Sequence, residues 1–477
     1  MKRYSIFIFL VFCFEIAFSQ QYFDTLQLRK SLTFIAHDDK NGRYPGTEGS
    51  NIVAEFILQE FKSAHLTPLC DNGYQYFSFF KGWEMGDSNT ATLNGKHLTC
   101  LTDFAPLNYF NTLNSTLSAQ VVAIGNSKDI DWNLCTNKWV LIYTNSYSKN
   151  KDMAIYAIKQ GVGGVILLDT NETFPTYKYY NGMRVKDKVV TTLGPVVQIS
   201  PEIGNKLLAK NNLNIDQLSQ MIKDNSNLVL PLNTEFYART NFIQKTITAK
   251  NVVALLEGSD PKLKDEYIVV GAHYDHEGTI ERMSKKTGQL RTYIYNGADD
   301  NGSGTVGILE LAKKISSQPN KPKRSIIFVA FDAEEEGLIG SEKFFDSCIA
   351  INPEQIKAMV NLDMIGRYNP KLKLSILGAN SSKEGVKLIK KLTKKSDLKV
   401  DCTSKNLLFS GSDHVNFYKR NIPVFFFNTE THKDYHRVSD EVEKIDFASM
   451  RKIILIVDKL IDDLANRKKN LRFTKIK

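Results

Sequence analysis

The second half of the chain alternates short apolar runs with amphipathic segments. Beyond residue 245, EYIVVGAHYD, SIIFVAFDAEE and IKAMVNLDMIG have the pattern of buried strands, and KLSILGA and IPVFFFNT continue the series. Apolar positions three and four residues apart predict helices from about 303 to 316 and from 447 to 465. Apolar strands interleaved with helices are typical of a mostly parallel sheet covered on both faces. We therefore predict an α/β fold with a mostly parallel central sheet flanked by helices.

The spacing of apolar residues divides the first half of the chain into two regions. Between residues 26 and 65 the helical spacing is interrupted by DDKNGRYPGTEGS, whose Gly, Pro and Asp content predicts an ordered loop between two helices, and residues 73–83 resemble a strand. From residue 120, VVAIG, KWVLIYT, GVGGVILLD and GPVVQIS are short apolar runs, with the helical stretch DMAIYAIKQ between the second and the third. This pattern predicts a small α/β unit at 120–236, inserted between 20–119 and 237–477.

The N-terminus has the pattern of a secretory signal peptide at residues 1–19. Lys2 and Arg3 precede a short apolar run that ends in a small residue, Ser19. Glu15 interrupts this run, and no later stretch reaches the roughly 20 apolar residues that a membrane-spanning helix needs. We therefore expect a secreted or periplasmic protein without a stable membrane anchor.

Charge and cysteine usage exclude two further classes. The formal net charge is +10 at pH 7, but the basic runs are dispersed and lack interleaved aromatic residues, so we expect no nucleic-acid partner. Five cysteines remain once Cys13 is removed with the signal peptide. This odd, widely spread set is no disulfide framework, although one bridge is compatible with it. The sequence does not indicate the oligomeric state.

Five motifs, GAHYDH, GADDNGSG, FDAEEEG, NLDMIG and KDYHRVSD, follow in order between residues 271 and 440. Five of the eight histidines lie in or close to these motifs: His273, His276, His414, His432 and His436. Nearly every candidate ligand follows the end of a predicted strand, where open α/β sheets form their ligand crevices. Imidazole and carboxylate groups without a Cys cluster favour a zinc site that keeps an open position. The sequence therefore predicts a metal-dependent hydrolase.

The first two motifs supply a ligand and a bridge. His273 emerges at a strand end, and Asp275 can accept a hydrogen bond from the other nitrogen of its ring. In GADDNGSG the glycines allow the backbone to approach an ion, and a carboxylate there can bridge two cations. We assign the bridge to Asp299 and a supporting role outside the ligand shell to Asp300.

The other motifs supply the base and the remaining ligands. Of the adjacent glutamates in FDAEEEG, one can bind metal while its neighbour takes a proton from water, so we assign Glu334 as the general base and Glu335 as a ligand. The phenol of Tyr435 can donate to a developing oxyanion. The predicted ligand set is His273, Asp299, Glu335, Asp363 and His436. For His276, His414 and His432 a role other than metal ligand is favoured, as a group that supports a ligand, a pocket wall or a surface residue.

These motifs, in this order, resemble those of the co-catalytic zinc exopeptidase family that includes bacterial leucyl aminopeptidases and glutamate carboxypeptidases. The resemblance implies two Zn²⁺ ions, one held by His273 and Asp363 and the other by Glu335 and His436, with Asp299 between them. It also implies that Glu334 is the general base, that Tyr435 stabilises the intermediate, and that the peptide bond from Asp299 to Asp300 is cis.

The resemblance extends to other segments. GRYPGTEGS resembles the loop before the peptidase core, GSDHVNFYKRNIPVFFF resembles the segment after the later strands, and residues 120–236 resemble a protease-associated domain. Glu336 departs from the pattern, because relatives often carry a non-acidic residue there, and this affects the choice between base and ligand.

The predicted function is a secreted zinc-dependent aminopeptidase acting on peptides or small proteins with a free N-terminus. In this prediction a metal-bridging hydroxide attacks the scissile carbonyl, with Glu334 as the base. One alternative is a carboxypeptidase or dipeptidase, which needs a cation for the α-carboxylate, and Arg367, Arg420 and Arg437 are candidates. Another is a non-catalytic receptor or binding module that has lost the metal, although no ligand is missing from the motifs.

Overall fold

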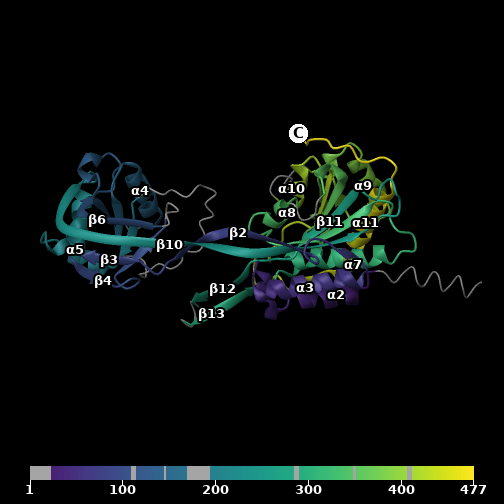
Figure 1. Ribbon diagram of the computed structural model, residues 1–477, viewed down its shortest axis with the longest axis horizontal. Coiled ribbons are helices and arrows are strands. Elements are labelled where there is room, and N and C mark those ends of the chain that lie inside the picture. The colour runs from purple at the N-terminus through teal and green to yellow at the C-terminus, as the bar shows by residue number, and fades with distance from the viewer. Residues whose placement is uncertain are drawn as a thin grey trace, which may run out of the picture. The chain divides into compact units, whose positions relative to one another are not determined.

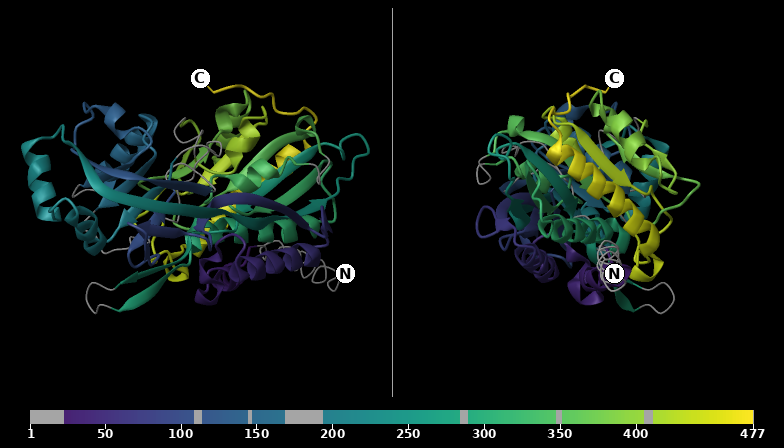
Figure 2. Two further views of the ribbon diagram at one scale, coloured as in Figure 1. Left: turned by 60° about the vertical axis from the view of Figure 1, so that its left-hand side comes forward. Right: turned by 90° about the vertical axis from the view of Figure 1, so that its right-hand side faces the viewer.

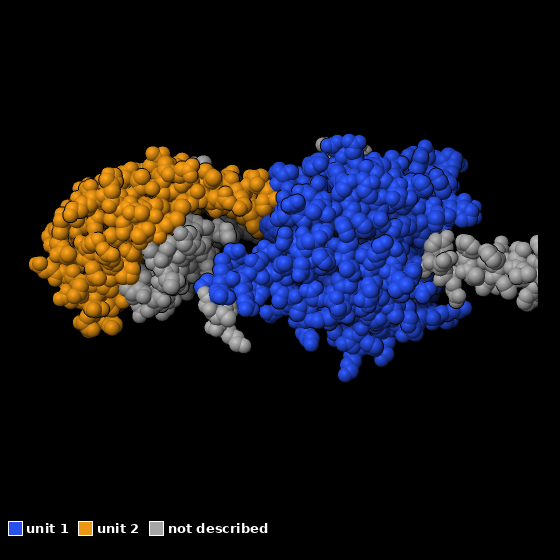
Figure 3. Space-filling view, turned by 90° about the horizontal axis from the view of Figure 1, so that it is seen from below, with its two compact units in different colours: residues 1–79, 248–477 blue, residues 80–247 orange. Residues whose placement is uncertain are grey.

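The computed structural model describes residues 23–108, 114–143, 147–168, 194–283, 289–346, 351–404 and 411–476, so the predicted signal peptide lies outside the described residues. The chain forms two compact units (Figure 3). The first contains Met1–Phe79 and Thr248–Lys477, and the second is Phe80–Ile247. Every candidate site residue belongs to the first unit.

The first unit is built on a mostly parallel sheet, as predicted. Its strands in spatial order are β17 (Val400–Asp401), β16 (Leu374–Leu377), β18 (Val424–Asn428), β15 (Ile356–Leu362), β11 (Tyr267–His273), β14 (Ser325–Phe331) and the last part of β10 (Val229–Leu256), which also pairs with β1 (Thr67–Pro68). The four central strands, β18, β15, β11 and β14, are parallel. Their carboxyl ends therefore meet at one edge of the sheet.

Helices cover both faces of this sheet. They are α2 (Thr25–Ile35), α3 (Glu48–Ser63), α7 (Gly304–Ser316), α8 (Ile339–Lys343), α9 (Gly385–Thr393), α10 (His414–Tyr418) and α11 (Phe447–Asn466). In β11, Ile268 and Val270 pack into the hydrophobic cluster that includes α2, α3, α7 and α11, whereas Val269 packs with Phe417 of α10 on the other face. Figure 1 shows α2 and α3 on one side of the strands and α8 and α10 on the other. Two covered faces explain why these strands are continuous apolar runs.

The predicted helix–loop–helix at the N-terminus is confirmed. The Asp24 side chain caps α2, the Thr47 side chain caps α3, and the loop between these helices contains the 3₁₀ segment η1 (Asp38–Arg43). Within the part of the chain that the structure describes, no helix combines the length and apolar character needed to span a bilayer.

A two-stranded hairpin separates the first two metal motifs, and the sequence pattern did not predict it. Its strands are β12 (Gly278–Met283) and β13 (Leu290–Tyr295), which pair antiparallel and project from the first unit (Figures 1 and 2). Most of its described side chains are exposed or half-buried. We predicted strands from continuous apolar runs, and an exposed hairpin does not need such a run.

The second unit has its own α/β core. Its strands β6 (Asn114–Ile124), β7 (Trp139–Tyr143), β8 (Gly164–Leu168) and β9 (Val196–Ile199) are parallel, and its helices are α4 (Tyr147–Lys159), α5 (Pro201–Ala209) and α6 (Ile215–Asp224). The predicted strands of this region are present, but the last two helices were not predicted. The segment β2 (Tyr74–Met85) and the long β10 both run from one unit into the other.

The predicted boundaries of the inserted unit, 120 and 236, are too narrow. The strand β3 (Thr90–Leu93) pairs with β4 (Lys96–Leu98) and with β10, and β5 (Phe104–Leu107) pairs with β9. These pairings place residues that we assigned to the N-terminal part of the peptidase domain in the second unit. The likeness of this unit to a protease-associated domain stays a prediction.

Candidate active site

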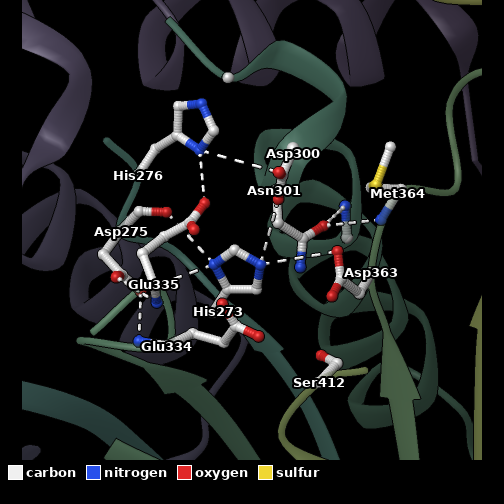
Figure 4. Close-up of polar contacts among 12 residues, drawn as sticks. His273, Asp275, His276, Asp300, Asn301, Glu334, Glu335, Asp363, Met364 and Ser412 are labelled. Carbon is white, nitrogen blue, oxygen red and sulfur yellow. Dashed lines mark hydrogen bonds and ion pairs between the residues drawn. The ribbon is translucent and has the colours of Figure 1, made fainter. Parts of the chain in front are cut away.

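The candidate ligands converge at the carboxyl ends of the parallel strands (Figure 4). His273 is the last residue of β11, Asp363 directly follows β15, and Glu334 and Glu335 lie in the turn after β14. Because these three strands are neighbours and parallel, His273 and Asp363, which are 90 positions apart, lie side by side.

The first group of donor atoms is formed by His273, Asp300 and Asp363. The Nε2 atom of His273 lies 3.4 Å from Oδ1 of Asp300 and 3.5 Å from Oδ1 of Asp363. All three side chains are buried. Their donor atoms lie within 4.8 Å of one another, which is close enough to share one metal ion.

The second group is formed by Asp300, Glu335 and His436. The Nε2 atom of His436 lies 3.1 Å from Oδ2 of Asp300 and 3.3 Å from Oε2 of Glu335. His436 also approaches Glu277, with Nδ1 3.3 Å from Oε1. The two oxygens of Asp300 thus face different imidazoles, His273 and His436, which is the arrangement of a carboxylate between two cations.

The assignment of the bridge to Asp299 is therefore corrected to Asp300. The Oδ1 atom of Asp299 accepts a hydrogen bond from the backbone N–H of Gly366 at 2.7 Å, and its Oδ2 lies 3.2 Å from Nε2 of His432. The cis peptide bond is likewise between Asp300 and Asn301, one residue later than expected. The two aspartates are equivalent as sequence letters, and only the path of the backbone decides which carboxylate faces the ligands.

Two side chains fix the backbone of the GADDNGSG loop. The Oδ2 atom of Asp440 accepts hydrogen bonds from the backbone N–H groups of Asp299 and Asp300, each at 3.0 Å. The Nδ2 atom of Asn301 donates to the carbonyl oxygen of Leu362 at 2.9 Å, which fastens this loop to the end of β15. The spacing of apolar and polar residues in the sequence does not predict such long-range hydrogen bonds.

Arg43, which is fully buried, holds the backbone of two ligand loops together. Its Nε atom donates to the carbonyl oxygen of Tyr274 at 2.8 Å, and its Nη2 donates to that of Gly297 at 3.1 Å, while Nη1 donates to Asn296. Tyr274 follows His273 directly, and Gly297 is three residues before Asp300. The guanidinium group thus supports both motifs without contacting the ligand side chains.

Asp275 connects the His273 motif to the glutamate turn. Its Oδ1 lies 3.5 Å from Nδ1 of His273, and its two carboxylate oxygens accept hydrogen bonds from the backbone N–H groups of Glu334, at 3.1 Å, and Glu335, at 3.2 Å. This position agrees with the supporting role that the sequence predicted for Asp275 and extends that role to the turn that contains the base.

His276, which we expected not to be a metal ligand, contacts the candidate ligand Glu335. Its ring is fully buried, and its Nδ1 lies 2.8 Å from Oε1 of Glu335. Its backbone N–H donates to the carbonyl oxygen of Arg43 at 3.4 Å, which connects it to the loop before α3. In contrast, His414 stacks on Phe426 with ring centroids 4.4 Å apart, as a core residue does.

The contact between His276 and Glu335 leads to a prediction. We expect His276→Ala to lower zinc affinity about 10- to 100-fold, because a ligand carboxylate that loses its supporting hydrogen bond is oriented less well. The measurement is a titration of metal-free protein with zinc in competition with a chromogenic chelator. His414→Ala, which removes a buried histidine away from Glu335, is the control and should leave zinc affinity within about threefold. Equal affinities for wild type and His276→Ala would contradict the supporting role.

Burial and the neighbouring charges shift the pKa values of Glu334 and Glu335 in opposite directions. Burial, together with the carboxylates of Glu335, Asp413 and Asp363, raises the pKa of Glu334 well above its ordinary value. Although burial opposes ionisation, hydrogen bonds with His276 and His436 lower the pKa of Glu335 to about 2. The pKa values of the adjacent glutamates are therefore shifted in opposite directions.

Beside the ligands lies a cavity of about 170 Å³. It is lined by His273, Asp300, Glu334, Glu335, Asp363, Met364, Leu377, Gly411, Phe426, Asn428, Glu430, Thr431, Tyr435 and His436. The ring of Tyr435 stacks on that of His436 at 3.9 Å, so its phenol lies at the cavity wall, where the sequence predicted an oxyanion donor. The unexpected acid of the motif, Glu336, accepts a hydrogen bond from Tyr44 at 2.8 Å and does not line this cavity.

The residues present fit a pair of zinc ions. Three carboxylates, Asp300, Glu335 and Asp363, lie close together with little exposure to solvent, and burying such charges without cations is costly. The donor atoms are imidazole nitrogens and carboxylate oxygens, which zinc accepts at catalytic sites. One ion would be held by His273, Asp300 and Asp363, and the other by Asp300, Glu335 and His436.

Comparison with known proteins identifies the family of this chain. Residues 251–461 match the model of peptidase family M28. The protein YfbL of Escherichia coli is 30% identical over 247 residues, which are 46% of this chain and 71% of YfbL. Aminopeptidase YwaD of Bacillus subtilis is 29% identical over 205 residues, 42% of this chain and 41% of YwaD, so the chain matches less than half of that relative.

A solved structure supports the fold. The zinc aminopeptidase BSAP from Bacillus subtilis superposes with a TM-score of 0.52 and 19% identity, covering 94% of this chain and 96% of BSAP. The resemblance that the five motifs indicated is confirmed by these matches, since the matched range contains all five of them. This chain belongs to peptidase family M28.

Proposed function

We propose that this protein is a secreted di-zinc aminopeptidase that removes N-terminal residues from peptides. The observation that carries the proposal is that Glu334 and both groups of ligands, joined by Asp300, line one cavity. When bound, the two zinc ions would polarise the scissile carbonyl and make water more acidic. The aminopeptidase YwaD and the zinc aminopeptidase BSAP, to which this chain is similar, support the reaction class.

Proton transfer is assigned to Glu334. Its raised pKa suits a group that takes a proton from the attacking water and later returns it to the leaving amine. Asp275 holds the turn of Glu334 in place through a backbone hydrogen bond, so the carboxylate keeps a defined direction. The phenol of Tyr435, at the cavity wall, donates to the oxygen on which negative charge develops.

The charge of the cavity favours an aminopeptidase over a carboxypeptidase or dipeptidase. Among the described residues that line it there is no lysine or arginine to hold an α-carboxylate. Arg367 pairs with Asp434 at 3.1 Å, and the guanidinium of Arg420 lies 3.9 Å from the ring centroid of Phe345. The carboxylates of the wall instead suit an α-ammonium group. A non-catalytic binding module is disfavoured because both ligand groups and the base are present.

Two features support secretion. The first is the signal-peptide pattern of residues 1–19. The second is that Cys70 is disulfide-bonded, because such bonds persist in oxidising compartments outside the cytosol. Export of a reporter fused to residues 1–19, compared with a fusion in which Phe9 and Leu10 are replaced by aspartate, tests this part of the proposal.

Metal dependence gives a direct test of the activity. We expect the purified protein to release p-nitroaniline from leucyl-p-nitroanilide, to lose that activity with a zinc chelator, and to regain it when zinc is added back. N-Acetyl-leucyl-p-nitroanilide, which lacks the free amine, should not be cleaved. Cleavage of the blocked substrate would contradict the aminopeptidase assignment, and activity unaffected by complete zinc removal would contradict the metal dependence.

A further inference from the structure

Glu430 contributes a fifth carboxylate to the cavity that contains Glu334, beside those of the base and the candidate ligands. It lies just beyond the end of β18, with a positive φ of 71°. The hydroxyl group of Ser375 donates a hydrogen bond to its Oε1, and its backbone N–H donates to Oδ1 of Asn428 at 2.6 Å. The side chain is thus directed and held by two neighbouring strands.

The position of Glu430 is coupled to that of the ligands. The Nδ2 atom of Asn428, whose Oδ1 holds the backbone of Glu430, donates to the carbonyl oxygen of Asp363 at 2.8 Å. Among the described residues, no lysine, arginine or histidine forms an ion pair with Glu430. A carboxylate that is fixed beside the site, and whose charge no described side chain neutralises, suits a cation from the substrate.

The spacing of the strands separates Glu430 from the base. Glu334 follows β14 and Glu430 follows β18, and these strands are three sheet positions apart, on the order of 14 Å between their backbones. The α-nitrogen of a peptide substrate is only two bonds from the carbonyl carbon that reacts beside Glu334. The substrate's N-terminal amine therefore stays near the ligands, whereas a long side chain of the first residue can extend toward Glu430.

Part of the cavity wall is apolar. Met364, Leu377 and Phe426 line the same cavity, the last two from β16 and β18. Lysine and arginine place apolar methylene groups along such surfaces and keep the charged end at a polar partner. An apolar wall that ends at a carboxylate therefore matches the shape and charge of a basic side chain.

We propose that Glu430 is a specificity residue that selects substrates with lysine or arginine at the N-terminus. This inference rests on the proposed aminopeptidase function and specifies its substrate class. In the proposed complex, the aliphatic part of the substrate's N-terminal lysine or arginine side chain packs on Leu377 and Phe426. Its cationic end pairs with Glu430. The reaction itself stays with Glu334.

The test compares kcat/KM for lysyl-, arginyl- and norleucyl-p-nitroanilide in wild type and Glu430→Gln. Norleucine has an uncharged side chain of nearly the length of the lysine stem. We expect Glu430→Gln to lower kcat/KM about tenfold for the lysyl and arginyl substrates, because a half-buried ion pair is lost, and to leave the norleucyl value within about twofold. Glu384→Gln, which removes an equal charge from an ion pair with Arg472 at 3.2 Å, is the control and should alter none of the ratios.

Binding of free lysine and norleucine, measured by calorimetry, gives a readout that needs no turnover. We expect wild type to bind lysine more tightly than norleucine and Glu430→Gln to lose this difference. An equal loss of kcat/KM on all three substrates, or an unchanged lysyl-to-norleucyl ratio in Glu430→Gln, would overturn the proposal. If zinc-replete wild type cleaves no substrate, the aminopeptidase function has failed, and the binding difference alone then decides the role of Glu430.

Discussion

Glu334→Gln is expected to lower kcat about a thousandfold while zinc stays bound, because the amide cannot take the proton from the attacking water. Glutamine keeps the shape of the side chain, and Glu334 is in neither predicted ligand set, so the two metal groups stay complete. Steady-state hydrolysis of leucyl-p-nitroanilide and metal analysis of the same sample measure the two quantities.

The neighbouring acid provides the control for this prediction. Glu336→Gln removes a carboxylate two residues away whose hydrogen bond goes to Tyr44, and it should keep kcat within about threefold of wild type. If Glu334→Gln has nearly normal activity, the proton acceptor has been assigned wrongly. If it loses zinc together with activity, Glu334 is a ligand and the roles within FDAEEEG must be exchanged.

Asp300→Asn is expected to reduce bound zinc below one ion per chain and to abolish measurable activity. The two carboxylate oxygens of Asp300 face His273 and His436, and the substitution replaces one of those oxygens with an amide nitrogen that cannot bind a cation. Asp300 would bind both zinc ions. Its substitution should therefore lower the bound zinc more than the substitution of a residue that binds only one ion. Metal analysis after gel filtration and a rate assay provide the measurement.

Asp299→Asn is the matched control, one residue earlier in the same loop. Its side-chain oxygen still accepts from the N–H of Gly366, and its new amide can donate to His432, so we expect zinc content near wild type and a loss of activity below about tenfold. The reverse result, with zinc lost in Asp299→Asn and kept in Asp300→Asn, would restore the assignment made from the sequence alone.

Most of the fold of the first unit was predictable, because its strands are buried on both faces. Continuous apolar runs such as those that became β11 and β14 leave little choice of element, and the motifs after them lie together at the carboxyl ends of these strands. The hairpin of β12 and β13 was missed for the converse reason, since its residues are largely exposed. The early boundary of the second unit was missed because its first strands are only three to four residues long.

A motif with one candidate ligand led to one assignment, whereas a motif with two neighbouring acids left the choice between them open. The sequence contains no signal that tells Asp299 from Asp300, because the choice depends on hydrogen bonds that their backbone N–H groups donate to Asp440, 140 residues beyond Asp300. For His276 the sequence left a supporting role, a pocket wall and a surface position open, because a single histidine after a strand does not show which group its ring faces. Glu430 lies in no motif, and only the pairing of β16 with β18 brings its partner Ser375 beside it.

The contacts of Arg43 have a consequence for how much of this protein can be removed. The range that matches the family, residues 251–461, includes all the ligands but begins more than 200 residues after the arginine that holds the backbone beside His273 and Asp300. A shortened protein limited to that range would contain every candidate metal-binding side chain. It would still lack the buried guanidinium group of Arg43, which connects the two ligand loops. We therefore expect a fragment designed from the matched region alone to be incomplete without the N-terminal segment that contains Arg43.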